Sequence, residues 1–193
     1  MRNYLLSLRY NGKNYAGYQI QANANTVGAE LLKALRVVFG QVTGLAGCSR
    51  TDSGVHALCY AASFQAEKEM DCQTVVRALN YHLPGDIAVF ACRYVPEGFH
   101  ARYSVKSKEY IYRIYNGPQR NPFYHDFMLF YPQPLDIGLL NAAAAQLVGT
   151  YDFSAFMASG SKIEDCVRTV YKAYFERQDD LVTFHIAADG FLY

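Results

Sequence analysis

The stretch from residue 167 to residue 187 reads V-R-T-V-Y-K-A-Y-F-E-R-Q-D-D-L-V-T-F-H-I-A. Residues 167–176 and 181–187 are rich in branched and aromatic side chains, which favour β-strands. The polar residues Gln178, Asp179 and Asp180 lie between the two strands and form a short turn. Two strands joined in this way form a hairpin, whose strands are antiparallel.

The same pattern extends over the rest of the chain. Further strands are predicted at residues 4–10, 58–65, 87–95 and 109–115, and helices from Thr26 to near Gly40, at 74–82 and at 135–148. Because strands outnumber helices and hairpins are visible, we expect an α+β fold with a mainly antiparallel mixed sheet and flanking helices. Residues 1–103 and 104–193 form two similar halves, and a cleft between them is a natural ligand site.

Composition limits the class of protein. Of the 193 residues 51% are hydrophobic and 18% charged, as in a folded globular chain, and no apolar run reaches the ~18 residues that a membrane helix needs. The five cysteines are widely spaced without a C-x-x-C, so we expect no disulfide framework, no metal site and a cytoplasmic protein. The net charge of +1 does not indicate a nucleic-acid partner. One cluster of basic residues fits either a solvated face or an RNA contact: Arg102, Lys106, Lys108, Arg113 and Arg120.

A polar loop between two apolar segments contains the main candidate for catalysis. Residues 48–57 read C-S-R-T-D-S-G-V-H-A, so that Asp52 has Arg50 two residues before it and Gly54 two residues after it. Loops held on a rigid scaffold often carry catalytic groups. However, an aspartate followed by Ser-Gly also favours an ordinary turn, and the arginine can be part of a surface ion pair. The residues alone leave both interpretations open.

This loop resembles the active-site loop of the tRNA pseudouridine synthase A family, whose pattern is G-R-T-D-x-G-V-H; Ser49 replaces the first glycine. Residues 10–21 are similar to the family's Y-D-G-x-x-F-x-G-W-Q-x-Q, with Asn11 in place of aspartate and Tyr18 in place of tryptophan. Four more segments match in the family's order: N-Y-H-L-P-G-D-I at 80–87, F-H-A-R-Y-S-V at 99–105, K-E-Y-I-Y at 108–112 and G-T-Y-D-F-S-A-F at 149–156.

The resemblance implies a pseudouridine synthase fold and an isomerisation of uridine that needs no cofactor and no metal. In this interpretation Asp52 is the catalytic residue, acting as a nucleophile or a general base, and whether it attacks C1′, attacks C6 or abstracts a sugar proton stays open. Arg50 fills the space left by the flipped uridine or grips its phosphate. Tyr110 stacks on the flipped uracil, and Arg102 holds a backbone phosphate. His56 and His100 are expected to be structural.

The resemblance also implies partners. The family acts as a homodimer on the anticodon stem-loop of tRNA, at uridines 38, 39 and 40. In the family, the F-L-Y found here at 191–193 continues into a helix with an arginine that pairs with the catalytic aspartate. That helix does not follow Tyr193, so we interpret the chain as lacking the family's C-terminal segment.

Three alternatives remain at this stage. The chain can bind RNA without catalysis, or modify an RNA other than tRNA. The third alternative is a dimeric aspartic protease, because residues 52–54 read D-S-G, which such enzymes use in pairs. No second D-[ST]-G occurs, the residues before Asp52 are not an apolar strand, and Arg50 would oppose the shared proton of a carboxylate pair.

Overall fold

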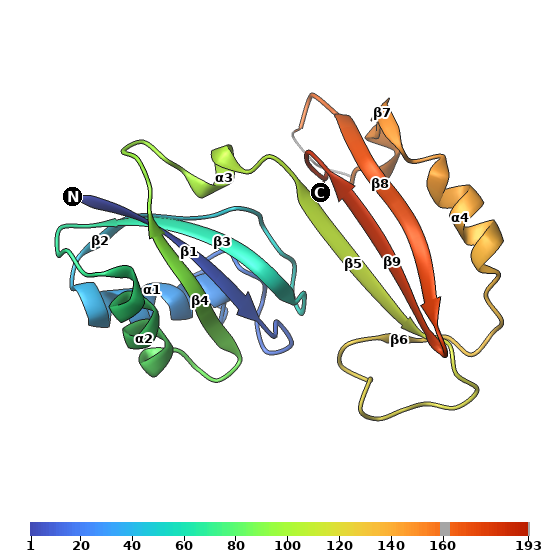
Figure 1. The fold of residues 1–193 in the computed structure, drawn as a ribbon, viewed down its shortest axis with the longest axis horizontal. Coiled ribbons are helices and arrows are strands. Elements are labelled where there is room, and N and C mark those ends of the chain that lie inside the picture. The colour runs from blue at the N-terminus through green and yellow to red at the C-terminus, as the bar shows by residue number, and fades with distance from the viewer. Residues whose placement is uncertain (159–162, 193) are drawn as a thin grey trace. The chain divides into compact units, whose positions relative to one another are not determined.

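The chain forms two compact units, Met1–Val105 and Lys106–Tyr193, in a computed structural model that describes residues 1–158 and 163–192. Each unit has its own β-sheet with helices beside it (Figure 1). All strand pairs but one in the described residues are antiparallel. The prediction of an α+β fold with mainly antiparallel strands is therefore confirmed.

The first unit is built on a sheet with the strand order β2-β3-β1-β4. The strands are β1 (Arg2–Tyr10), β2 (Val42–Gly47), β3 (Ala57–Ala66) and β4 (Ile87–Tyr94). Strand β1 lies in the centre, and its alternate residues Tyr4, Leu6 and Leu8 are completely buried on one face. This alternation fixes which face of the sheet receives the helices.

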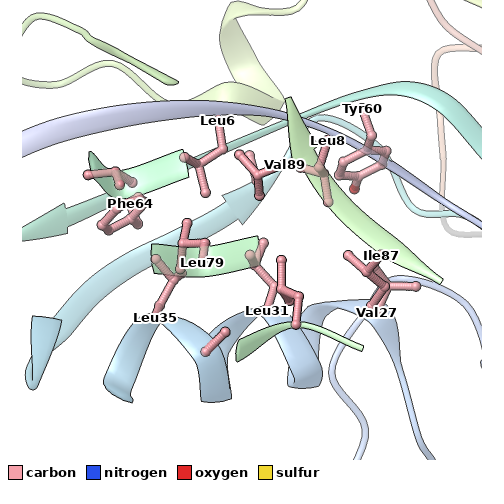
Figure 2. Packing of buried hydrophobic residues seen from close by; sticks show 14 of the residues in the cluster. Leu6, Leu8, Val27, Leu31, Leu35, Tyr60, Phe64, Leu79, Ile87 and Val89 are labelled. Carbon is pink, nitrogen blue, oxygen red and sulfur yellow. The ribbon is translucent and has the colours of Figure 1, made fainter. Parts of the chain in front are cut away.

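Two helices cover that face, α1 (Val27–Phe39) and α2 (Cys72–His82) (Figure 1). Thr26 and Asp71 are their N-caps, and each side chain accepts a backbone N–H from the first turn. Leu31 and Leu35 of α1 and Leu79 of α2 are fully buried against the sheet (Figure 2). A large apolar core therefore lies directly behind the strands that carry the Asp52 loop.

The second unit has the strand order β6-β5-β9-β8-β7, in which only β5 and β6 are parallel within the described residues. Helix α4 (Ile137–Ala145) packs on β8, and the cluster of buried apolar residues is small: Ala144, Val170, Ala173 and Ala188. The strands are β5 (Lys108–Tyr115), β6 (Leu129–Phe130), β7 (Gly149–Asp152), β8 (Val167–Gln178) and β9 (Leu181–Ala188). Two short helices complete the chain, α3 (Ala101–Ser104) in the first unit and η1 (Ser154–Phe156) in the second.

The sequence pattern missed some elements and misplaced some ends. Strand β2 was not predicted, because glycines lower strand propensity and Gly44 has a φ of +63°; pairing with β3 holds the segment extended. Helix α4 is shorter than the predicted 135–148, because Asp136 caps its start and the helical pattern ends at Ala145. Helix α2 begins two residues before the predicted start, after its cap Asp71.

Candidate active site

The Asp52 loop, residues 48–56, connects β2 to β3 at one end of the first sheet. The side chains of Asp52 and Arg50 are both exposed. Within residues 1–158 and 163–192, neither of these two side chains has an ion-pair or hydrogen-bond partner. The loop therefore presents one carboxylate and one guanidinium to solvent, both free to meet a ligand.

The first half of the loop is held by three tyrosines. The Tyr60 hydroxyl donates a hydrogen bond to the Ser49 carbonyl oxygen. The hydroxyls of Tyr10 and Thr51 share a hydrogen bond of 3.0 Å, and the Tyr18 N–H donates to the Thr51 carbonyl oxygen at 3.3 Å. The backbone is thus fixed on both sides of Arg50, while its side chain stays exposed.

The second half of the loop is held by the segment that follows β1. The Tyr15 carbonyl oxygen accepts two hydrogen bonds, from the Gly54 N–H at 3.1 Å and from the Ser53 hydroxyl at 3.3 Å. The Gly12 N–H donates to Nδ1 of His56 at 3.2 Å, so the ring of His56 also links the loop to this segment. Asp52 therefore lies on a loop whose backbone is bound before and after it.

Two glycines allow this close packing. A Cβ on Gly12 would lie 1.9 Å from the Val55 carbonyl oxygen, and a Cβ on Gly17 would lie 2.2 Å from the Thr51 carbonyl oxygen. Gly17 also has a φ of +89°, in the left-handed region that other residues rarely adopt. The segment can approach the loop only because both positions lack a side chain.

Tyr10, Tyr15 and Tyr18 belong to the motif matched at residues 10–21, but no role was predicted for their side chains, and Tyr60 was not singled out. Their partners in the loop lie far away in sequence. Burial is the main reason that the pKa values of Tyr15, Tyr18 and Tyr60 are raised above the ordinary value for tyrosine. These hydroxyls therefore stay neutral at physiological pH and support the loop as hydrogen-bonding groups or by packing.

The predicted phosphate contact Arg102 lies on the short helix α3 of the first unit. The Ala101 N–H donates to the buried Ser63 hydroxyl on β3 at 3.0 Å, which anchors this helix to the sheet. His100 caps the helix by accepting the Arg102 N–H at Nδ1, and its ring stacks on Tyr103 with 4.5 Å between the ring centroids. The Arg102 side chain is exposed on a fixed backbone, as a phosphate contact requires.

The predicted stacking residue Tyr110 lies in the second unit, on β5, opposite Ile186 of β9. Its ring makes an edge-to-face contact with that of Phe191, with 4.7 Å between the ring centroids, and 37% of the residue is exposed. Tyr112 lies on the same face of the strand and is 54% exposed. Tyr110 is thus partly packed, which orients its ring, and partly accessible to a ligand.

The described residues show neither a metal-binding group nor a membrane helix. No cluster of three or more His, Cys, Asp or Glu side chains in this part of the chain could hold a metal ion. None of its helices is long and apolar enough to cross a membrane.

Comparisons with known proteins agree on one family. The family described as tRNA pseudouridine synthase matches residues 7–104 and 143–193. A tRNA pseudouridine synthase A of Thermoanaerobacter sp. is 43% identical over 193 residues, covering all of this chain and 79% of the relative. Its counterparts in Lacticaseibacillus casei and Methylacidiphilum infernorum are 41% and 38% identical, over 100% and 98% of this chain and 79% and 75% of their own lengths. The chain belongs to the tRNA pseudouridine synthase family.

Proposed function

We propose that this protein isomerises uridine to pseudouridine in tRNA and that Asp52 carries the reaction. The observation that carries the proposal is the exposed Asp52 carboxylate on a loop bound before and after it, in a chain of this family. Catalytic groups need such a fixed position, because misplacing a reacting group by about 1 Å can cost 100-fold in rate. The family match favours this function over the aspartic protease.

The proposed reaction is an isomerisation, which leaves the atomic composition of the nucleotide unchanged. The bond from C1′ of the ribose to N1 of uracil breaks, the base turns, and a bond forms from C1′ to C5. The hydrogen on C5 leaves as a proton, and N1 gains one. Asp52 acts as the nucleophile or as the base that moves a proton, and its carboxylate is exposed to the substrate in either role.

The substrate uridine must leave its stack before it can reach Asp52, at a cost of a few kcal/mol. Arg50 projects from the loop two residues before Asp52, so it can take the place of the flipped base or hold its phosphate. Tyr110 offers a partly exposed ring for stacking, a contact that stabilises a flipped base by about 1–3 kcal/mol. Arg102 holds a backbone phosphate, which positions the RNA without reading its sequence.

The proposal includes the partners that the resemblance implies. The substrate is the anticodon stem-loop of tRNA, with uridines 38, 39 and 40 as targets, and the enzyme works in the cytoplasm as a homodimer. Sedimentation of the protein with and without tRNA measures the oligomeric state. Mapping the modified positions in the product identifies the target uridines and separates this substrate from another RNA.

Tritium release from unmodified tRNA labelled at uridine C5 tests the activity, because only bond formation at C5 expels that atom. We expect release by the wild-type protein and a loss of at least about 1000-fold for Asp52→Asn, which keeps the shape but removes the charge. Binding of tRNA by this variant should stay close to wild type. Asp71→Asn is the matched control, because asparagine is an equally good N-cap and Asp71 lies outside the loop.

Each outcome separates the alternatives. Release that persists in Asp52→Asn would mean that another group carries the reaction. A wild-type protein that binds tRNA without releasing tritium would support the alternative of RNA binding without catalysis. If Tyr110 stacks on the flipped uracil, Tyr110→Ala should lower turnover more than tRNA binding, and Tyr112→Ala serves as its control on the same strand face.

A further inference from the structure

A second carboxylate of the first unit is connected to the Asp52 loop through one tyrosine. Oδ1 of Asp86 accepts a hydrogen bond of 2.6 Å from the Tyr15 hydroxyl, and the Asp86 carbonyl oxygen accepts the Asn11 N–H at 2.9 Å. Asp86 lies just before β4, in a turn closed by the Ile87 N–H donating to the Pro84 carbonyl oxygen. The carboxylate is half-buried, and Tyr15 is 4% exposed.

Tyr15 binds the loop with its backbone rather than with its ring. Its carbonyl oxygen accepts both the Gly54 N–H and the Ser53 hydroxyl, from the two residues that directly follow Asp52. The Tyr15 N–H donates to the Gly12 carbonyl oxygen at 2.9 Å, which closes a turn. The ring hydroxyl, bound to Asp86, therefore fixes the residue whose carbonyl oxygen fixes the loop.

We propose that Tyr15 and Asp86 form a positioning pair, whose hydrogen bond holds the Asp52 carboxylate at the angle that the chemical step needs. The inference rests on the proposed function and adds two residues that act through the loop without touching the substrate. Hydrogen bonds to a charged acceptor are shorter and stronger than neutral ones, and 2.6 Å lies in their range. Burial and then Asp86 raise the pKa of Tyr15, so the hydroxyl keeps its proton and donates at neutral pH.

Substitutions can remove the bond of the pair and keep most of the packing. Tyr15→Phe keeps the ring and removes only the hydroxyl that binds Asp86. Asp86→Asn keeps an oxygen that can accept the hydroxyl proton, whereas Asp86→Ala keeps none. Two of these variants therefore remove the hydrogen bond, one from each side, and the third weakens it, all with little change of packing.

Steady-state kinetics by tritium release from C5-labelled tRNA tests the pair. We expect kcat to fall about 10-fold in Tyr15→Phe and in Asp86→Ala, with KM within about two-fold of wild type, because the loop positions Asp52 and not the RNA. Asp86→Asn should recover most of the loss. The double variant of Tyr15→Phe and Asp86→Ala should be no slower than either single variant, since both remove the same bond.

Tyr4→Phe is the matched control. Tyr4 is fully buried in the same core, and its hydroxyl bonds the backbone of Lys68 and Met70 near the start of α2. This substitution should lower stability without changing kcat. An equal loss of kcat in Tyr4→Phe, or a wild-type kcat in Tyr15→Phe, would overturn the proposal.

Amide hydrogen exchange followed by NMR gives a second measurement, which does not depend on activity. We expect the Gly54 amide to exchange about 10-fold faster in Tyr15→Phe, while the Cys48 amide, bound to the Ala61 carbonyl oxygen, stays unchanged. Unchanged Gly54 exchange would overturn the positioning role even if the wild-type protein released no tritium. Faster Gly54 exchange without any wild-type turnover would uphold the coupling and reject the proposed function.

Discussion

The two units differ in how they hold the residues expected to meet RNA. In the first unit, Asp52 and Arg50 project from a loop bound to buried tyrosines, and an apolar core of two helices and a sheet lies behind it. In the second unit, Tyr110 lies on a strand of a sheet whose cluster of buried apolar residues contains only three alanines and Val170 among the described residues. The first unit therefore fixes the backbone of its loop by hydrogen bonds, whereas the second unit presents Tyr110, partly exposed, on the face of a strand.

This difference fits the chemistry proposed for each unit. A reacting carboxylate tolerates little displacement, because proximity and alignment supply much of the rate. A stacking ring tolerates more, because aromatic contacts act over a range of offsets and centroid distances. Many exposed aromatic residues of the second unit fit a contact surface, among them Tyr112, Phe123 and Phe127.

Apart from Asp52→Asn, the largest effect is expected at Gly17, where a close approach to the loop is combined with a left-handed backbone conformation. Gly17→Ala combines an unfavourable φ of +89° with a Cβ only 2.2 Å from the Thr51 carbonyl oxygen. We expect a cost of about 2–4 kcal/mol in the free energy of unfolding and a loss of turnover of about 100-fold, because the Asp52 loop must move. Urea denaturation and tritium release measure the two effects.

Gly40→Ala is the control that separates the effect of backbone strain from that of a steric clash with the loop. Gly40 ends α1 with a φ of +79°, but a Cβ there would meet nothing within 4 Å. This variant should cost about 1 kcal/mol in stability and leave turnover intact. If both variants lowered turnover alike, the close approach of Gly17 to the loop would not matter for catalysis.

The next prediction compares the apolar cores of the two units by making the same substitution, valine to alanine, in each. Val89 on β4 and Val170 on β8 are both buried, one in the large core and one in the small cluster. Val89→Ala should lower the free energy of unfolding by about 2 kcal/mol and Val170→Ala by about 1 kcal/mol, since a thin core closes around a cavity more easily. Equal losses in chemical denaturation would show that the second core is as rigid as the first.

Sequence patterns predicted the strands along which apolar or aromatic residues recur, and missed elements that depend on contacts with distant residues. Strands β1, β5, β8 and β9 were predicted because apolar or aromatic residues recur along them, whereas β2 is glycine-rich and is held extended by its partner β3. Local pattern cannot show such pairing, because it depends on residues that are remote in sequence.

The Asp52 loop illustrates the same limit at the site. Its place between two apolar segments was visible from the sequence, and the motif named Asp52 as the candidate. The bond from Tyr15 to Asp86 was not visible, because 71 residues separate the two and only the packing of β4 beside β1 brings them together. Supporting residues of this kind have no spacing rule that a sequence could reveal.

A smaller effect, this time an increase in the free energy of unfolding, is expected from removal of the Tyr18 hydroxyl. Among the described residues, its hydroxyl is the one buried side-chain oxygen or nitrogen without a hydrogen-bond partner. Burying such a group costs free energy, so Tyr18→Phe should raise the free energy of unfolding by about 1 kcal/mol and leave the ring against Tyr60 in place. Chemical denaturation checks the sign, and a loss of stability would show that the hydroxyl is bonded in solution.

The smallest effect should come from the charged face of the second unit. Oε1 of Glu109 accepts hydrogen bonds from Lys172 Nζ at 2.8 Å and from Nδ1 of His185 at 3.1 Å. The bond from Lys172, and then that from His185, lowers the pKa of the Glu109 carboxyl. A lowered pKa in the folded state means that the stabilisation is present above the ordinary pKa of about 4.3 and is lost as the pH falls through the folded value.

Glu109→Gln should therefore cost a few tenths of a kcal/mol at pH 7 and progressively less below about pH 4, because 39% of the side chain is exposed and solvent screens the pair. Unfolding in urea between pH 7 and pH 3 measures the difference from wild type. Glu67→Gln is the control, since Glu67 is exposed and has no ion-pair partner among the described residues. A difference that did not shrink on acidification would mean that Glu109 stabilises the sheet by packing and not by its charge.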